Sequence, residues 1–104
     1  MYYSSEDKNI MRGLFIAVDK FPNEIYTLEF SDGTIIRAKI DTLFETDNGI
    51  ELGEDGYEEY NACAMRVIEI VVLGKDHHFE EGKLTEINYH NYPLSIKTSS
   101  GEII

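Results

Sequence analysis

The sequence predicts a mainly β domain, an antiparallel twisted sheet or small barrel of about seven short strands with one short helix. Turn residues recur throughout the 104-residue chain, and the runs between them alternate apolar and polar side chains. This alternation is the period of a strand with one buried face. A helix over residues 57–65 would make the fold α+β. The length suits one domain that spans residues 1–104.

The N-terminal part is expected to be a loose arm followed by a strand. Residues 1–9 are polar apart from two adjacent tyrosines and one methionine. Residues 10–18, IMRGLFIAV, form a mostly apolar run of strand length, with Gly13 placed at a bulge. Residues 21–24 follow as a turn, since Pro and Asn are frequent turn residues.

A β-hairpin around Asp32-Gly33 is the strongest local prediction. The dipeptide lies between two runs in which apolar and polar residues alternate, residues 25–31 and 34–41. Asp-Gly between such runs is typical of a two-residue hairpin turn. The side chains expected on the core face are Tyr26, Leu28 and Phe30 before the turn, and Ile36, Ala38 and Ile40 after it.

The chain from residue 54 to residue 74 begins acidic and aromatic and ends in the longest apolar run. Tyr57, Tyr60 and Ala64 have the i, i+3, i+7 spacing of one helical stripe. We therefore expect residues 57–65 to form a short helix. The alternative interpretation is one long irregular strand that continues into the apolar run.

The apolar run over residues 67–73 is β-branched and is predicted to be a buried strand. Strand geometry places Ile68, Ile70 and Val72 on one face, which we expect to lie on the core. Gly74 and a polar loop over residues 75–82 follow. Three further strands are expected at residues 84–89, 94–98 and 102–104.

Acidic residues outnumber basic residues by 20 to nine, which gives a formal charge of −11. We therefore expect no nucleic-acid partner, because nucleic-acid affinity comes largely from neutralising phosphates. Anionic membranes are disfavoured for the same reason. A basic protein would instead be attracted. The alternative is that the excess acid only keeps a small protein soluble.

Much of the acid lies between Lys39 and Arg66, an interval with no other Lys or Arg. Such a run is often only a solvated loop, but aromatic side chains within it are typical of binding surfaces. The carboxylates would attract a partner and the tyrosines would anchor it, unless a tyrosine lies in the core. The predicted partner-binding residues are Glu51, Glu54, Asp55, Tyr57, Glu58, Glu59 and Tyr60.

The sequence predicts no catalytic residue, no metal site and no cofactor. Cys63 lies between alanines and close to acids, which raise rather than lower a thiol pKa, so we interpret it as a small buried residue. His77 and His78 are adjacent and point apart in an extended segment, and together with His90 they match no zinc spacing. A small metal-dependent enzyme that uses these histidines remains an alternative.

The expected compartment is the cytoplasm. The single cysteine cannot form an internal disulfide, which suits a reducing environment. The polar N-terminus has no secretory pattern, and no apolar run is long enough to span a bilayer.

Two segments, GYEEYNACAMRVIEI at residues 56–70 and EINYHNYPLSIKTSSGEII at residues 86–104, resemble a group of small acidic bacterial immunity proteins. The shared pattern is a Tyr-Glu-Glu-Tyr-type segment that leads into an apolar strand, then a strand, an Asn-Tyr-Pro turn and a Gly-x-Ile-Ile end. The resemblance covers roughly the C-terminal half. It implies an immunity protein of a contact-dependent inhibition or polymorphic toxin system.

Such a protein would be cytoplasmic and non-catalytic, and would bind the C-terminal domain of one cognate toxin, often a nuclease. Nucleases bind polyanions in basic clefts, which carboxylates and aromatic anchors can block. We expect a monomer or weak dimer. A structural or regulatory β-module that self-associates through a sheet edge is the other alternative.

Overall fold

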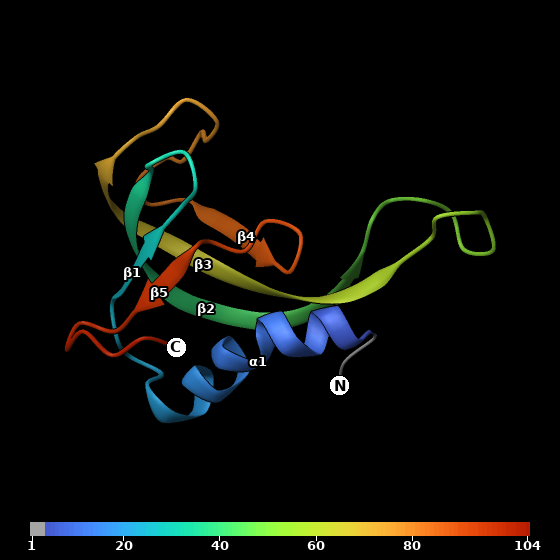
Figure 1. Ribbon diagram of the computed structural model, residues 1–104, viewed down its shortest axis with the longest axis horizontal. Helices are drawn as coiled ribbons and strands as arrows, with labels where there is room; N and C mark the ends of the chain where they lie inside the picture. The colour runs from blue at the N-terminus through green and yellow to red at the C-terminus, as the bar shows by residue number, and fades with distance from the viewer. Residues whose placement is uncertain (1–3) are drawn as a thin grey trace.

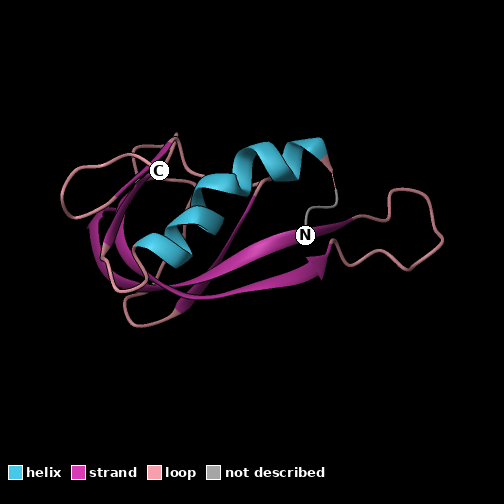
Figure 2. Cartoon of the chain, turned by 90° about the horizontal axis from the view of Figure 1, so that it is seen from below, coloured by secondary structure: helices cyan, strands magenta, loops and turns pink. Residues whose placement is uncertain are grey.

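The computed structural model describes residues 4–104, which form a five-stranded antiparallel sheet with a helix across one face (Figures 1 and 2). The strand order is β4-β3-β2-β1-β5, so β4 and β5 are the edges of an open sheet. The mainly β class is confirmed, with five strands rather than about seven in this part of the chain. The elements are α1 (Ser5–Lys20), β1 (Tyr26–Glu29), β2 (Ile35–Asp47), β3 (Glu59–Val72), β4 (Leu84–Asn88) and β5 (Ser95–Lys97).

The strand expected at residues 10–18 is wrong, because this segment lies within α1. Ser4 caps the helix, and its side chain accepts a hydrogen bond from the Asp7 N–H at 3.1 Å. The helix also replaces most of the expected loose arm, of which residues 1–3 lie outside the described chain. Three buried side chains at helical spacing face the sheet, namely Met11, Leu14 and Ala17.

Gly13, expected at a bulge, instead lies in α1 where the C-terminal residue crosses the helix. A Cβ at this position would lie 2.8 Å from the carbonyl carbon of Ile104. The Ile104 N–H donates to the Ile96 carbonyl at 3.0 Å. The absence of a side chain at Gly13 therefore allows the C-terminus to pack between the helix and β5.

The predicted β1–β2 hairpin is confirmed, but its two-residue turn is wrong. The Phe30 N–H donates to the Thr34 carbonyl at 2.8 Å, so the loop has three residues, 31–33. Leu28 pairs with Ile36 and Tyr26 with Ala38, and all four side chains are buried. Gly33 in the turn has φ +87°, a conformation that glycine adopts without strain. The hairpin supplies the middle of the core, against which α1 packs.

The helix expected over residues 57–65 is wrong, and the alternative of one long irregular strand is correct. Residues from Glu59 to Val72 form β3, which pairs with β2 over its whole length. A bulge at Ile68 shifts the register between the Arg37–Glu69 and Ala38–Val67 pairs. Val67 therefore points into the core, whereas Ile68 and Val72, expected there, are 42% and 47% exposed.

The remaining strands agree with expectation. β4 lies within the predicted strand at 84–89, and β5 lies within that at 94–98. The expected strand at 102–104 is reduced to a single bridge between Lys97 and Ile103. No helix within residues 4–104 is long and apolar enough to span a membrane.

The β2–β3 hairpin determines the shape of the molecule. β2 and β3 have 13 and 14 residues, whereas β4 pairs with only the middle of β3, from Ala62 to Arg66. Both strands therefore run past their neighbours, and the loop that joins them projects from one end (Figure 1). We call residues 48–58 the hairpin tip.

Candidate partner-binding site at the hairpin tip

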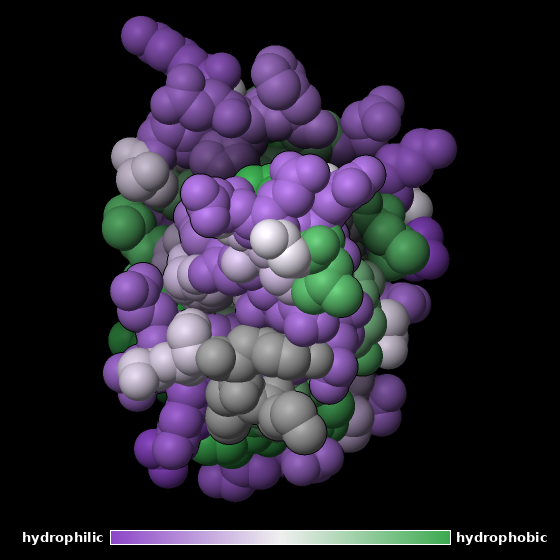
Figure 3. All heavy atoms as spheres, turned by 90° about the vertical axis from the view of Figure 1, so that its right-hand side faces the viewer, coloured by the Kyte–Doolittle hydropathy of each residue, from purple (hydrophilic) through white to green (hydrophobic). Residues whose placement is uncertain are grey.

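The seven residues predicted to bind a partner lie in the hairpin tip or immediately after it. Glu51, Glu54 and Asp55 are exposed within the tip, and Glu59 is exposed at the start of β3. Figure 3 views the molecule from this side, and the surface there is largely hydrophilic with isolated hydrophobic side chains. The other three predicted residues are less accessible: Tyr57 and Glu58 are half-buried, and Tyr60 is buried.

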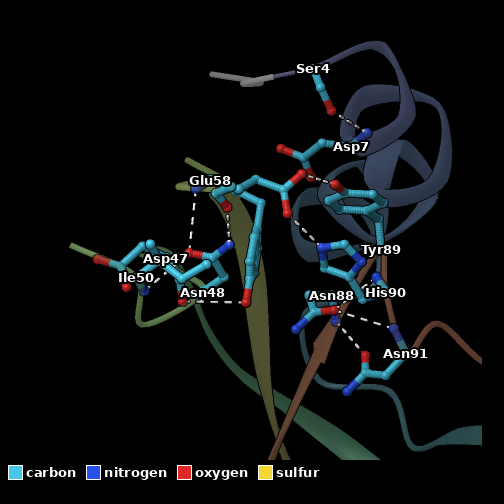
Figure 4. A network of polar contacts seen from close by, with 12 residues as sticks. Ser4, Asp7, Asp47, Asn48, Ile50, Glu58, Asn88, Tyr89, His90 and Asn91 are labelled. Carbon is cyan, nitrogen blue, oxygen red and sulfur yellow. Dashed lines mark hydrogen bonds and ion pairs between the residues drawn. The ribbon is translucent and has the colours of Figure 1, made fainter. Parts of the chain in front are cut away.

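The Asn48 side chain holds the two sides of the tip together (Figure 4). Its amide nitrogen donates to the Gly56 carbonyl at 2.6 Å. Its amide oxygen accepts from the N–H groups of Ile50 and Glu58, both at 3.3 Å. The Asn48 N–H also donates to the Glu58 carbonyl at 3.1 Å. One short polar side chain thus satisfies backbone groups on both sides of the loop.

Two successive turns shape the outer part of the tip. The Glu54 N–H donates to the Glu51 carbonyl, and the Tyr57 N–H donates to the Glu54 carbonyl, both at 3.1 Å. Gly53 and Gly56 have φ of +91° and +84°, which L side chains rarely adopt. The acidic side chains therefore project from a defined backbone, which lowers the entropy lost on binding.

Glu58 connects the tip to the end of β4 (Figure 4). Its carboxylate accepts a hydrogen bond from the Tyr89 hydroxyl and lies 2.6 Å from His90 Nε2. These two hydrogen bonds lower the pKa of Glu58, and the bond from Tyr89 contributes the most. The same contact raises the pKa of Tyr89 to about 12. Glu58 is thus engaged within the protein, unlike the exposed acids of the tip.

Tyr60 forms part of the support beneath the tip. Its side chain is 7% exposed, and its hydroxyl donates to the Asp47 carbonyl at 3.3 Å. Its ring meets Tyr89 and His90 edge-on, with centroids 5.9 and 5.3 Å apart. Of the two tyrosines predicted as anchors, the half-buried Tyr57 is therefore the more accessible to solvent.

The N-terminus of α1 is joined to the base of the tip by two buried residues, Asp7 and Asn61. The Asn61 backbone N–H and side-chain amide donate to Asp7 Oδ2, at 3.2 and 2.9 Å. The two residues are 54 positions apart, and nothing in their local sequence indicates the contact. The pair fixes the helix against the first residues of β3.

No Lys or Arg side chain among residues 4–104 neutralises the exposed acids of the tip. The contacts within 4 Å between a basic and an acidic side chain among residues 4–104 are Arg37–Glu69, His77–Asp32 and His90–Glu58. None of them involves the three exposed acids Glu51, Glu54 and Asp55. Their negative charge is therefore directed to solvent, where it can attract a cationic surface.

A family model described as "Cognate immunity protein YxxD" matches residues 10–104. The chain belongs to this family. The match covers the hairpin tip and every strand, and it confirms the resemblance to immunity proteins of toxin systems. A cognate immunity protein has a toxin protein as its partner. No curated protein and no solved structure matched the chain.

The histidines considered for a metal site make separate contacts in this YxxD-family protein. His77 contacts Asp32 near the β1–β2 turn, His90 contacts Glu58 below the tip, and His78 is exposed. Within residues 4–104, no group of three or more His, Cys, Asp or Glu side chains could hold a metal ion. Cys63 is buried, as expected, and burial raises the pKa of its thiol to about 12.

Proposed function

We propose that this immunity protein neutralises its cognate toxin in the cytoplasm by placing the hairpin tip on a basic surface of the toxin's C-terminal domain. The basic surface we infer is the substrate cleft of a nuclease. The observation that carries the proposal is that Glu51, Glu54 and Asp55 project from an ordered loop and have no cationic partner among residues 4–104.

The physical basis is mimicry of a polyanion. A nuclease cleft holds phosphates with Lys and Arg side chains, and carboxylates can occupy the same positions. Long-range attraction would accelerate encounter, while the ordered loop would limit the entropy lost on docking. Leu52, 80% exposed beside the carboxylates, offers an apolar contact that excludes water.

The seven predicted residues then divide into three roles. We assign attraction to Glu51, Glu54, Asp55 and Glu59, and a packing contact to Tyr57. Glu58 and Tyr60 would act indirectly, because their side chains contact Tyr89 and His90 beneath the tip.

The test uses the full chain and the C-terminal domain of the toxin encoded beside it. The variant Glu51→Gln, Glu54→Gln, Asp55→Asn should slow association by about tenfold at low salt. It should also reduce the salt dependence of association. The matched control is Asp19→Asn, Glu29→Gln, Glu80→Gln, which removes three exposed acids elsewhere. An equal effect of the two variants would show that only net charge matters and would contradict the proposed site.

Self-association is a second candidate, favoured by the apolar end of β3. This end extends beyond the segment that pairs with β4, and Ile68, Val71 and Val72 are each more than 40% exposed there. Size-exclusion chromatography of the purified chain tests it. A dimer that Val71→Lys disrupts would support self-association through this edge, and a monomer at all accessible concentrations would contradict it.

A further inference from the structure

The face of the sheet opposite α1 carries a pocket that the proposed function does not use. The pocket has a volume of about 400 Å³ and is lined by Ile25, Thr27, Arg37 and Lys97 and by the turn after β5. Arg37 lies ten residues before Asp47 on β2. The pocket is therefore roughly 30 Å from the hairpin tip along an extended strand.

Strand register brings a hydroxyl between two cations in this pocket. Thr27 on β1 pairs with Arg37 on β2 and with Lys97 on β5. Paired residues project from the same face, about 4.8 Å from one strand to the next. Their neighbours Leu28, Ile36 and Ile96 are buried, which places the three pocket side chains on the solvent face.

This face carries several cations beside the carboxylates of Glu29 and Glu69. Four of the chain's nine Lys and Arg residues, all of which lie within residues 4–104, project from it. Lys39 even pairs directly with Arg66 in the β2–β3 register. Like charges directly opposite one another destabilise a sheet. The Arg66 guanidinium donates to the Gly82 carbonyl at 2.7 Å, and both residues of this pair lie outside the pocket. The four residues are Arg37, Lys39, Arg66 and Lys97.

The donors in the pocket are largely uncommitted. Arg37 lies 3.5 Å from Glu69, but both side chains are more than half exposed, so the pair is weak and leaves further guanidinium N–H groups available. Within residues 4–104, no carboxylate lies within 4 Å of the Lys97 ammonium. At the rim, the Ser99 hydroxyl donates to the Glu24 carboxylate at 2.8 Å, which marks the acidic boundary of the pocket.

We propose that this pocket binds an oxyanion, a phosphate or carboxylate group, with Arg37 and Lys97 as charge partners and the Thr27 hydroxyl as an additional donor. A planar guanidinium and an ammonium on neighbouring strands suit a group with two or three oxygens. The source is a free small phosphate compound or the carboxylate of an acidic molecule. The site is independent of the hairpin tip and does not require the toxin.

Titration of the ¹⁵N-labelled full chain with sodium phosphate, at constant ionic strength and neutral pH, tests the proposal. We expect saturable shifts of the Thr27, Lys97 and Gly101 amide signals. Arg37→Gln and Lys97→Gln should each weaken binding about tenfold, because each removes a charge-assisted hydrogen bond. Thr27→Val, which keeps the side-chain shape, should weaken it less. Unchanged circular dichroism would show that the variants are folded.

The matched control is Lys39→Gln, which removes the same charge from the same strand and face but lies outside the pocket. We expect it to change the affinity by less than about twofold. A parallel titration with succinate identifies the source of the oxyanion. Saturation with either probe supports the site, and saturation with only one identifies its preferred chemistry. Non-saturable shifts with both probes, or an equal loss with Lys39→Gln, would overturn the proposal.

Discussion

Asp32 Oδ2 lies 2.9 Å from His77 Nδ1 and joins the β1–β2 turn to the loop after β3. The same carboxylate also accepts from the Thr34 hydroxyl and the backbone N–H groups of Thr34 and Asp76. The His77 ring stacks on Phe79 at 5.1 Å. The hydrogen bonds, with that from His77 the strongest, hold the pKa of Asp32 well below its usual range.

Asp32→Asn should make stability less dependent on pH. Because the folded-state pKa of Asp32 lies below its unfolded value, its contribution is complete above about pH 5 and is lost as the pH falls through the folded value. The variant should therefore be less stable than the parent at pH 7, and the difference should shrink as the pH falls toward 3. Urea unfolding at several pH values measures this. A difference that stays constant with pH would contradict it.

Gly74→Ala should destabilise the protein. A Cβ at residue 74 would lie 2.5 Å from Asp32 Oδ2 and 2.6 Å from the Asp32 carbonyl oxygen. Relief of this overlap requires a backbone shift, which we expect to cost about 1–3 kcal/mol and to outweigh the entropic benefit of removing a glycine. Urea unfolding at pH 7 checks the magnitude. The exposed neighbour Lys75 serves as the control, and Lys75→Ala should have little effect.

The local parts of the fold could be predicted from the sequence, and the parts set by tertiary contact could not. The Asp32-Gly33 hairpin is encoded within a short segment, so its place and its core-facing residues followed from alternation, whereas its three-residue loop did not. The spacing of Met11, Leu14 and Ala17 is helical, but the surrounding run is apolar enough to pass for a strand. The bulge at Ile68 reverses which side chains of β3 face the core, and only pairing with β2 creates it.

The candidate site also has one part that the local sequence predicts and another part that depends on tertiary contacts. Glu51, Glu54 and Asp55 lie within one short stretch, so their shared position on one exposed loop could be predicted from the acidic interval alone. The engagement of Glu58 by Tyr89 and His90 depends on residues 31 and 32 positions away. Such a contact leaves no local pattern in a single sequence, because only the folded sheet brings these residues together.

Asn61→Ala should lower stability more than removal of an exposed asparagine. The substitution removes the side-chain donor that lies 2.9 Å from the buried Asp7 carboxylate. The loss of a donor to a buried charged group should cost about 3 kcal/mol. Asn9→Ala, at an exposed position of α1, is the matched control and should cost less than about 0.5 kcal/mol. Equal losses in chemical unfolding would show that the Asp7–Asn61 pair does not hold the helix against β3.

Asn48→Ala tests whether toxin binding depends on the ordered conformation of the tip as well as on its negative charge. The substitution removes three hydrogen bonds that tie the two sides of the loop together, but leaves Glu51, Glu54 and Asp55 in place. Long-range attraction to the toxin should therefore persist, so the association rate at low salt should stay within about twofold. Docking would now require the loop to be ordered, and we expect affinity to fall about tenfold through faster dissociation.

Surface plasmon resonance with the toxin's C-terminal domain distinguishes these effects, and hydrogen exchange of the free chain checks that residues 48–58 have become more mobile. Loss of order in the tip with no change in dissociation would mean that the toxin does not contact this loop in its ordered form. The charge variant of the tip should show the opposite kinetic pattern, with slower association, because it removes attraction while it keeps the Asn48 hydrogen bonds. The charge variant therefore tests whether the tip acts through its electrostatic attraction, and Asn48→Ala tests whether it acts through its fixed conformation.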